Sequence, residues 1–194
     1  MKENLEELDN WFESRYAAAK AKEEDSHVPS MSIIATKGTL DWAYPPFILA
    51  STGAALGWDV SIFFTFYGLE LLKEEPDLKV SPLGNPAMPM KMPVGPQWFQ
   101  DINWNMPNIL PSNIPGFESF ATTMMKKTTQ KKGVASIQEL RELCIETDVK
   151  LIACNMTVEL FGYSRDDFIP DVADWVGAAY YLPFTQQSDV CLFI

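Results

Sequence analysis

The chain has 194 residues, 47% of them hydrophobic, and a formal net charge of −11 at pH 7. This composition suits a folded domain with a large core and excludes a disordered chain, while the acidic balance argues against binding to nucleic acid or to an anionic membrane surface. Three cysteines without CxxC spacing and a single histidine leave no zinc ribbon, disulfide framework or multi-histidine site, so we expect neither metal nor cofactor.

Residues 1–27 are predicted to form an amphipathic helix and a linker. Within 3–22 the apolar side chains recur at intervals of three or four residues, as in a helix with one buried face: Leu5, Leu8, Phe12, Tyr16 and Ala19. The acidic start has no apolar signal core, which predicts a cytoplasmic protein. His27 lies in a polar stretch and is expected to be a solvated linker residue rather than a catalytic group.

Residues 28–194 are predicted to form one α/β domain in which strands and helices alternate. Apolar, β-branched runs predict strands at 31–36, 58–64, 149–153, 172–177 and 189–194. Helical patterns cover 44–56, 66–75 and 121–132, a capped helix starting at Ser136, a short helix closed by Gly162, a turn at 164–170 and a short helix at 178–182. This order predicts a three-layer sandwich with a mainly parallel, flavodoxin-like sheet of about five strands.

A Pro- and Met-rich insertion at 77–118 interrupts this alternation. Eight of the fourteen prolines fall between Pro82 and Pro115, which excludes a long helix or a central strand. We expect an ordered, irregular segment that covers the domain or meets another subunit. Its methionines favour adaptable packing over a Cu(I) site.

The apolar run from Trp42 to Leu69 contains one charge, Asp59, and invites a membrane interpretation. Pro45-Pro46 and the Gly57-Trp58-Asp59 turn divide it into two short halves. A buried helix followed by a buried strand explains the run, so no stable membrane insertion is expected.

Cys154 lies at the junction between the predicted strand at 149–153 and the short helix that follows it. Open α/β folds bind ligands at this edge of the sheet, and unpaired N–H groups at a helix start favour a thiolate. A small core residue ending a strand is the alternative, and position alone leaves both open. Cys144, in a predicted buried stripe with Ile137, Leu140 and Leu143, and Cys191, in the last strand, are expected to be packing residues.

Three segments, 34–41 around Lys37-Gly38, 84–89 and 151–157 around Cys154, resemble the DsrE/DsrF-like family, in particular its subgroup with a long hydrophobic insertion. The resemblance covers about residues 30–194. It implies an α/β sandwich, oligomeric assembly, and a carrier cysteine, matching Cys154, that holds sulfane sulfur as a persulfide. Sulfur donor and acceptor proteins are the implied partners, and a sulfurtransferase activity is left open. Peroxidase chemistry is not expected, because no resolving thiol stands beside Cys154.

Substrate contacts are expected from the loop after the first predicted strand, from Tyr67 after the second predicted strand, and from the turn after Cys154. The candidates are Lys37, Gly38, Thr39, Tyr67, Asn155, Met156 and Thr157. Simple structural roles for them, such as a helix cap or a packed ring, remain open. The alternative function is a non-catalytic small-ligand-binding or assembly module on a flavodoxin-like scaffold. The apolar insertion and the N-terminal helix predict a homo-oligomer.

Overall fold

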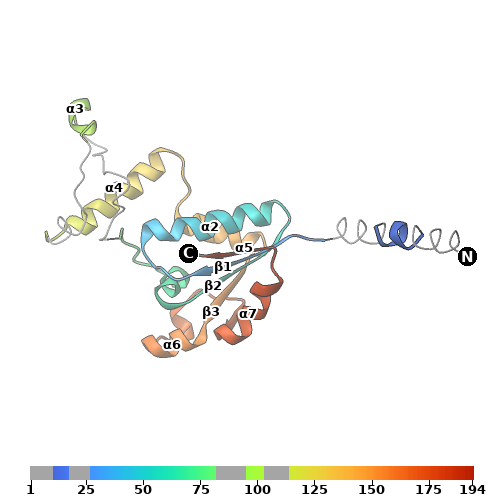
Figure 1. Cartoon of the computed structure of the whole chain (residues 1–194). Coiled ribbons are helices and arrows are strands. Elements are labelled where there is room, and N and C mark those ends of the chain that lie inside the picture. Colours follow the sequence, from blue (N-terminus) through green and yellow to red (C-terminus); the bar gives the residue numbers. More distant parts are fainter. Residues whose placement is uncertain (1–10, 18–26, 82–94, 103–113) are drawn as a thin grey trace, which may run out of the picture.

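Five strands form a single, wholly parallel sheet in the computed structural model, which describes residues 11–17, 27–81, 95–102 and 114–194. The strands are β1 (Ser30–Ala35), β2 (Asp59–Phe64), β3 (Lys150–Cys154), β4 (Asp174–Val176) and β5 (Val190–Phe193). Their order in the sheet is β4-β3-β2-β1-β5, so the chain steps outward from β1 and then crosses back to its other side. The predicted α/β class is confirmed (Figure 1).

Helices cover both faces of the sheet. On one, here called the α2 face, lie α2 (Leu40–Ala55) and α5 (Ile137–Glu146); on the other, the α7 face, lie α6 (Asn155–Phe161) and α7 (Ala178–Gln187) (Figure 1). Successive strand residues alternate between the two faces. Ile33, Ile62 and Leu151 therefore join the large core under α2, whereas Phe63 and Cys154 form a small cluster with Tyr181 of α7.

Helix α2 begins four residues before the predicted start at residue 44. Its first amide, that of Leu40, donates to the carbonyl of Lys79 at 2.8 Å. Because Lys79 is distant in the sequence, the local sequence pattern does not predict this contact. Pro45 and Pro46 consequently stand in the second turn rather than the first. Each removes one intrahelical hydrogen bond, and near the start of a helix this loss is confined to its first carbonyls.

Several other elements differ in type or length from their prediction. The segment after β2 is a 3-10 helix, η1 (Phe66–Leu72), α4 (Phe117–Lys131) begins before residue 121, and α7 runs on past Pro183. A capping box is present at the start of α5, where a cap was predicted at Ser136, and a second one at η3 (Arg165–Asp167). The described middle of the insertion contains one short helix, α3 (Gln97–Gln100).

Two burial predictions were wrong. Leu143 of α5 is 43% exposed, and Arg141 occupies the buried position instead. Cys191 is exposed, because β5 is an edge strand whose α7 face is only partly covered.

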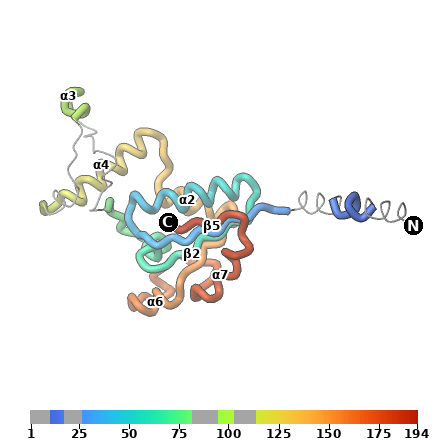
Figure 2. The backbone as a smooth tube through the Cα atoms, viewed as in Figure 1, coloured from blue at the N-terminus to red at the C-terminus, as the bar shows by residue number. Residues whose placement is uncertain are grey.

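The insertion and the N-terminal segment are described only in part. Residues 77–81 run beside α2 and α4: the amide of Ser81 donates to Asp41 Oδ1 at 2.9 Å, and that of Val80 to Thr122 Oγ1 at 3.1 Å. The methionine-rich stretch within 82–94 lies outside the described residues. Residues 11–17 are helical, as predicted, and the rest of the helix expected over 3–22 lies outside them as well (Figure 2).

Candidate functional site

The loops after β1 and β2 touch backbone to backbone at the carboxyl rim of the sheet. A side chain at Gly38 would collide with the carbonyl of Tyr67, and one at Gly68 with the carbonyl of Ala35. The amide of Thr65 also donates to the carbonyl of Ala35 at 3.0 Å. Glycine is therefore required at both positions, and the two loops form one continuous wall.

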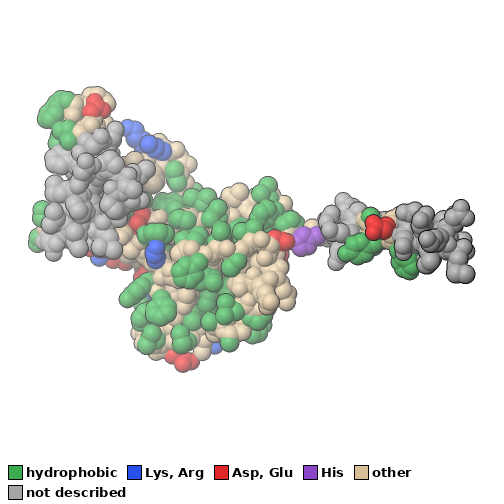
Figure 3. Space-filling model, viewed as in Figure 1, with side chains coloured by type: hydrophobic (Ala, Val, Ile, Leu, Met, Phe, Trp, Pro, Cys, Tyr) green, Lys and Arg blue, Asp and Glu red, His purple; other side chains and the backbone are tan. Residues whose placement is uncertain are grey.

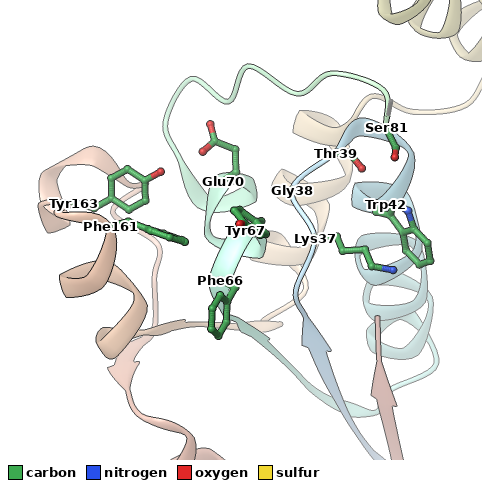
Figure 4. Close-up of a pocket in the computed structure, with 10 residues that line it drawn as sticks. All are labelled: Lys37, Gly38, Thr39, Trp42, Phe66, Tyr67, Glu70, Ser81, Phe161 and Tyr163. Atoms are coloured by element: carbon green, nitrogen blue, oxygen red, sulfur yellow. The ribbon is translucent and has the colours of Figure 1, made fainter. Parts of the chain in front are cut away.

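A pocket of about 450 Å³ opens beside this wall (Figure 4). It is lined by the loop after β1, the first turn of α2, one side of η1, the start of the insertion and the end of α6; the residues are Lys37, Gly38, Thr39, Trp42, Phe66, Tyr67, Glu70, Ser81, Phe161 and Tyr163. Four of the seven candidate substrate contacts thus line one cavity, namely Lys37, Gly38, Thr39 and Tyr67.

The pocket is lined by two charged side chains, Glu70 and Lys37, and only Glu70 has an ion-pair partner among the described residues. Glu70 pairs with Lys73, whose Nζ lies 2.7 Å from Glu70 Oε2, and this hydrogen bond is the main reason why the pKa of Lys73 is raised. Lys37 Nζ lies 3.1 Å from the centroid of the Trp42 ring. No carboxylate among the described residues lies within ion-pair distance of Lys37.

Aromatic rings form the far side of the pocket. Tyr67 stacks on Phe161 with centroids 5.8 Å apart, and Phe161 meets the edge of Tyr163 at 5.9 Å. Tyr163 also makes an edge contact with Phe168, with ring centroids 5.6 Å apart. Because Gly162 closes α6 in the left-handed conformation, the two rings that flank it come from the end of that helix and the loop beyond it.

Cys154 does not line this pocket. It is the last residue of β3 and the N-cap of α6, and its side chain lies on the α7 face with that of Ile152. It is 2% exposed and packs in the cluster with Phe63 and Tyr181. The structure therefore places the thiol at the expected junction, but in the buried cluster with Phe63 and Tyr181 rather than in the cavity.

The three candidates after Cys154 have separate surroundings. Asn155 donates its side-chain amide to Glu159 Oε1 at 2.8 Å, and Met156 is 58% exposed. Thr157 is fully buried, and its Oγ1 accepts the amide of Phe66 at 3.3 Å. Phe66 has a positive φ of 49°, so Thr157 holds a strained turn of the pocket wall against the first turn of α6.

The other two cysteines and the histidine stand apart from Cys154. Cys144 is fully buried on the α2 face and donates its S–H to the carbonyl of Phe47 at 3.6 Å. Cys191 pairs with Ser32 in the sheet and is exposed. His27 Nε2 lies 2.9 Å from Asp189 Oδ1. These residues precede β1 and β5 and so lie at the amino ends of the strands, opposite the rim that carries the pocket.

Burial raises the pKa of the Cys144 thiol to about 12, which disfavours its thiolate form. At pH 8 we expect iodoacetamide to modify Cys191 within minutes and to leave Cys144 unmodified in the native protein, because a thiol with that pKa has about a thousandth of the usual thiolate fraction. Peptide mass spectrometry over a time course measures both. Modification of Cys144 as fast as that of Cys191 contradicts the structure.

Six of the ten residues that line the pocket were not among the predicted substrate contacts: Trp42, Phe66, Glu70, Ser81, Phe161 and Tyr163. A local signal existed for Trp42, which falls in the first turn of the helix after the Lys37 loop. None existed for Phe161 and Tyr163, because their contact with Tyr67 depends on how α6 packs.

None of the described helices is both long and apolar enough to cross a membrane. Together, these features define a wound α/β protein with a cavity at the carboxyl rim of its sheet and a separate, buried cysteine at the end of β3. The model of the DsrE/DsrF/DrsH-like family matches residues 27–193, and the chain belongs to this family.

Two relatives each align with most of the chain. The chain is 55% identical over 164 residues to the sulfur carrier protein DsrE2 of Allochromatium vinosum, an alignment that covers 84% of this chain and 97% of that protein. It is 28% identical over 163 residues to the uncharacterized protein YrkE of Bacillus subtilis, covering 84% and 95% respectively.

Proposed function

We propose that this protein is a sulfur carrier that receives sulfane sulfur on Cys154 and passes it to the thiol of an acceptor protein. The observation that carries the proposal is the 55% identity to a sulfur carrier protein over 97% of its length. Cys154 is the favoured carrier because, of the three cysteines, it alone ends a strand at the carboxyl rim.

The chemistry requires only thiol–disulfide-type exchange. The Cys154 thiolate attacks the outer sulfur of a donor persulfide, a new S–S bond forms as the donor's S–S bond breaks, and the donor leaves as a thiolate. An acceptor thiolate then attacks the outer sulfur of the Cys154 persulfide and releases the Cys154 thiolate. Each step exchanges one S–S bond for another, so no external oxidant or reductant is needed.

Because Cys154 is buried, a carrier role requires a local opening. Helix α7 is the element best suited to move, since Tyr181 is the only one of its own residues that is buried. Elements with few buried contacts open at the lowest free-energy cost.

Exposed apolar side chains support self-association as part of the same proposal. Tyr180, Leu182 and Phe184 of α7 are each more than half exposed, as is Phe193 of β5. Figure 3 shows apolar side chains spread over the visible side of the α/β domain. A second copy or a sulfur-transfer partner would cover such a surface.

The carrier assignment is tested by mass spectrometry of the intact, reduced protein after exposure to polysulfide. The test uses Cys191→Ser, because the exposed Cys191 thiol could itself take up sulfur. Cys191→Ser should gain the mass of one sulfur atom, which dithiothreitol then removes, and the double variant Cys154→Ser/Cys191→Ser should gain none. Sulfur uptake by the double variant would remove the assignment.

A non-catalytic small-ligand-binding module is the second candidate, and the separation of the pocket from Cys154 favours it. In that case polysulfide adds sulfur to Cys191 alone, and a ligand binds the pocket regardless of the residue at position 154.

A further inference from the structure

The pocket has the size of a site for an organic molecule. Its volume of about 450 Å³ lies within the range of small-molecule sites and far exceeds what a sulfide ion or one persulfide sulfur fills. It stands at the carboxyl rim, where open α/β folds bind their ligands. A ligand that fills the pocket must therefore have an organic framework in addition to any reactive or charged group.

One end of the pocket is suited to an anion. Lys37 has no ion-pair partner in the described part of the chain, although the whole protein carries a net charge of −11. The 16-residue helix α2 begins at Leu40, with the positive end of its dipole beside the same loop. Its first-turn carboxylate, Asp41, accepts the amide of Ser81.

An unpaired hydroxyl stands at this end. Thr39 Oγ1 is buried and has no hydrogen-bond partner in the described structure. Thr39 is also the N-cap of α2, yet its side chain makes no capping hydrogen bond. Rotation about the Cα–Cβ bond redirects this hydroxyl, so the oxygen atom of a ligand can supply the missing partner.

The other end is suited to a flat, apolar body. Tyr67 and Phe161 stack with 24° between their planes, and Tyr163 meets the edge of Phe161. Figure 4 shows Tyr67 between Trp42 with Lys37 on one side and Phe161 with Tyr163 on the other. Aromatic rings favour an aromatic partner in stacked or edge contact.

We propose that this pocket binds a small aromatic carboxylate, with the carboxylate at Lys37 and Thr39 and the ring among Tyr67, Phe161 and Tyr163. The Lys37 ammonium, already over the Trp42 ring, remains between that ring and the carboxylate. The proposal does not depend on Cys154, because the thiol does not line the pocket.

Isothermal titration calorimetry with three probes tests it. Phenylacetate has both the charge and the ring, acetate has only the charge, and benzyl alcohol has only the ring. We expect one site per chain for phenylacetate, with an affinity at least about ten-fold higher than for either other probe. Equal affinity for acetate and phenylacetate, or no heat with phenylacetate, overturns the proposal.

Matched variants assign the two ends of the site. Lys37→Met should reduce phenylacetate affinity to that of benzyl alcohol, and Lys37→Arg should restore most of it. Lys150→Met is the control, since Lys150 pairs with Asp59 at the other edge of the sheet and should not affect binding. Unchanged binding by Lys37→Met overturns the proposal.

Thr39→Val separates a ligand contact from a structural role. It should raise the melting temperature of the free protein, because it removes an unpaired buried hydroxyl, and weaken phenylacetate binding several-fold. Unchanged phenylacetate binding removes Thr39 from the proposed site. Cys154→Ser should bind phenylacetate as wild type does, so failure of the carrier role and failure of this inference give different results.

Discussion

Tyr181→Ala is expected to detach α7 and to raise the alkylation rate of Cys154 at least ten-fold. Tyr181 is 1% exposed, stacks on Phe63 with centroids 4.7 Å apart, and its hydroxyl lies 2.9 Å from Ser61 Oγ. No other residue of α7 is buried. Truncating a buried aromatic side chain costs about 3–5 kcal/mol, a large share of the stability of a domain of this size.

Two measurements distinguish local release of α7 from general unfolding. Urea unfolding gives the loss of stability, and peptide mapping after iodoacetamide treatment gives the modification of Cys154 and Cys144 separately. Local release exposes Cys154 and leaves Cys144 protected, because Cys144 belongs to α5 and packs against α2 on the other face of the sheet. Equal modification of the two thiols contradicts local release.

Tyr181→Phe is the matched control. It keeps the ring stacked on Phe63 and removes only the hydroxyl, whose pKa is raised by burial and which therefore stays protonated and able to donate. We expect a loss of about 1 kcal/mol and little change in Cys154 alkylation. If Tyr181→Phe exposed Cys154 as fully as Tyr181→Ala, the hydrogen bond rather than the ring would hold α7.

The fold was predictable because its signals are local. Buried parallel strands are continuous apolar runs, and Ser136 with Glu139 forms the capping box that their spacing predicts. Periodicity was less informative about which side of α5 is buried. The burial of Arg141 in place of Leu143 depends on carbonyls about 70 residues away, which no helical pattern contains.

The candidate site was predictable only as far as the rim. Parallel topology brings Lys37, Tyr67 and Cys154 to the same edge of the sheet. The face on which each side chain lies is set by strand register, and Cys154 shares the α7 face with Ile152. That α7 would cover this face with a single tyrosine is a tertiary feature with no local signal.

Arg141→Ala is expected to destabilise the protein by about 3 kcal/mol, because it removes two charge-assisted hydrogen bonds from a buried position. Arg141 is 5% exposed, and its Nη1 donates to the carbonyls of Leu71 at 3.1 Å and Lys73 at 2.7 Å. Burial lowers the pKa of the guanidinium, which nonetheless stays charged near neutral pH. Without it, the carbonyls of Leu71 and Lys73 lose this donor.

The loss should reach the pocket, since η1 carries Tyr67 and Glu70 of its wall. Urea unfolding measures the stability, and Arg165→Ala is the control: Arg165 lies 5.2 Å from the centroid of the Trp175 ring, at the surface, and should contribute less than about 1 kcal/mol. Arg141→Lys, which retains the charge but not the fork of donors, should recover only part of the stability. Equal losses for Arg141→Ala and Arg165→Ala would mean that the end of η1 is held by apolar packing of Leu71 and Leu72, both fully buried, rather than by the guanidinium.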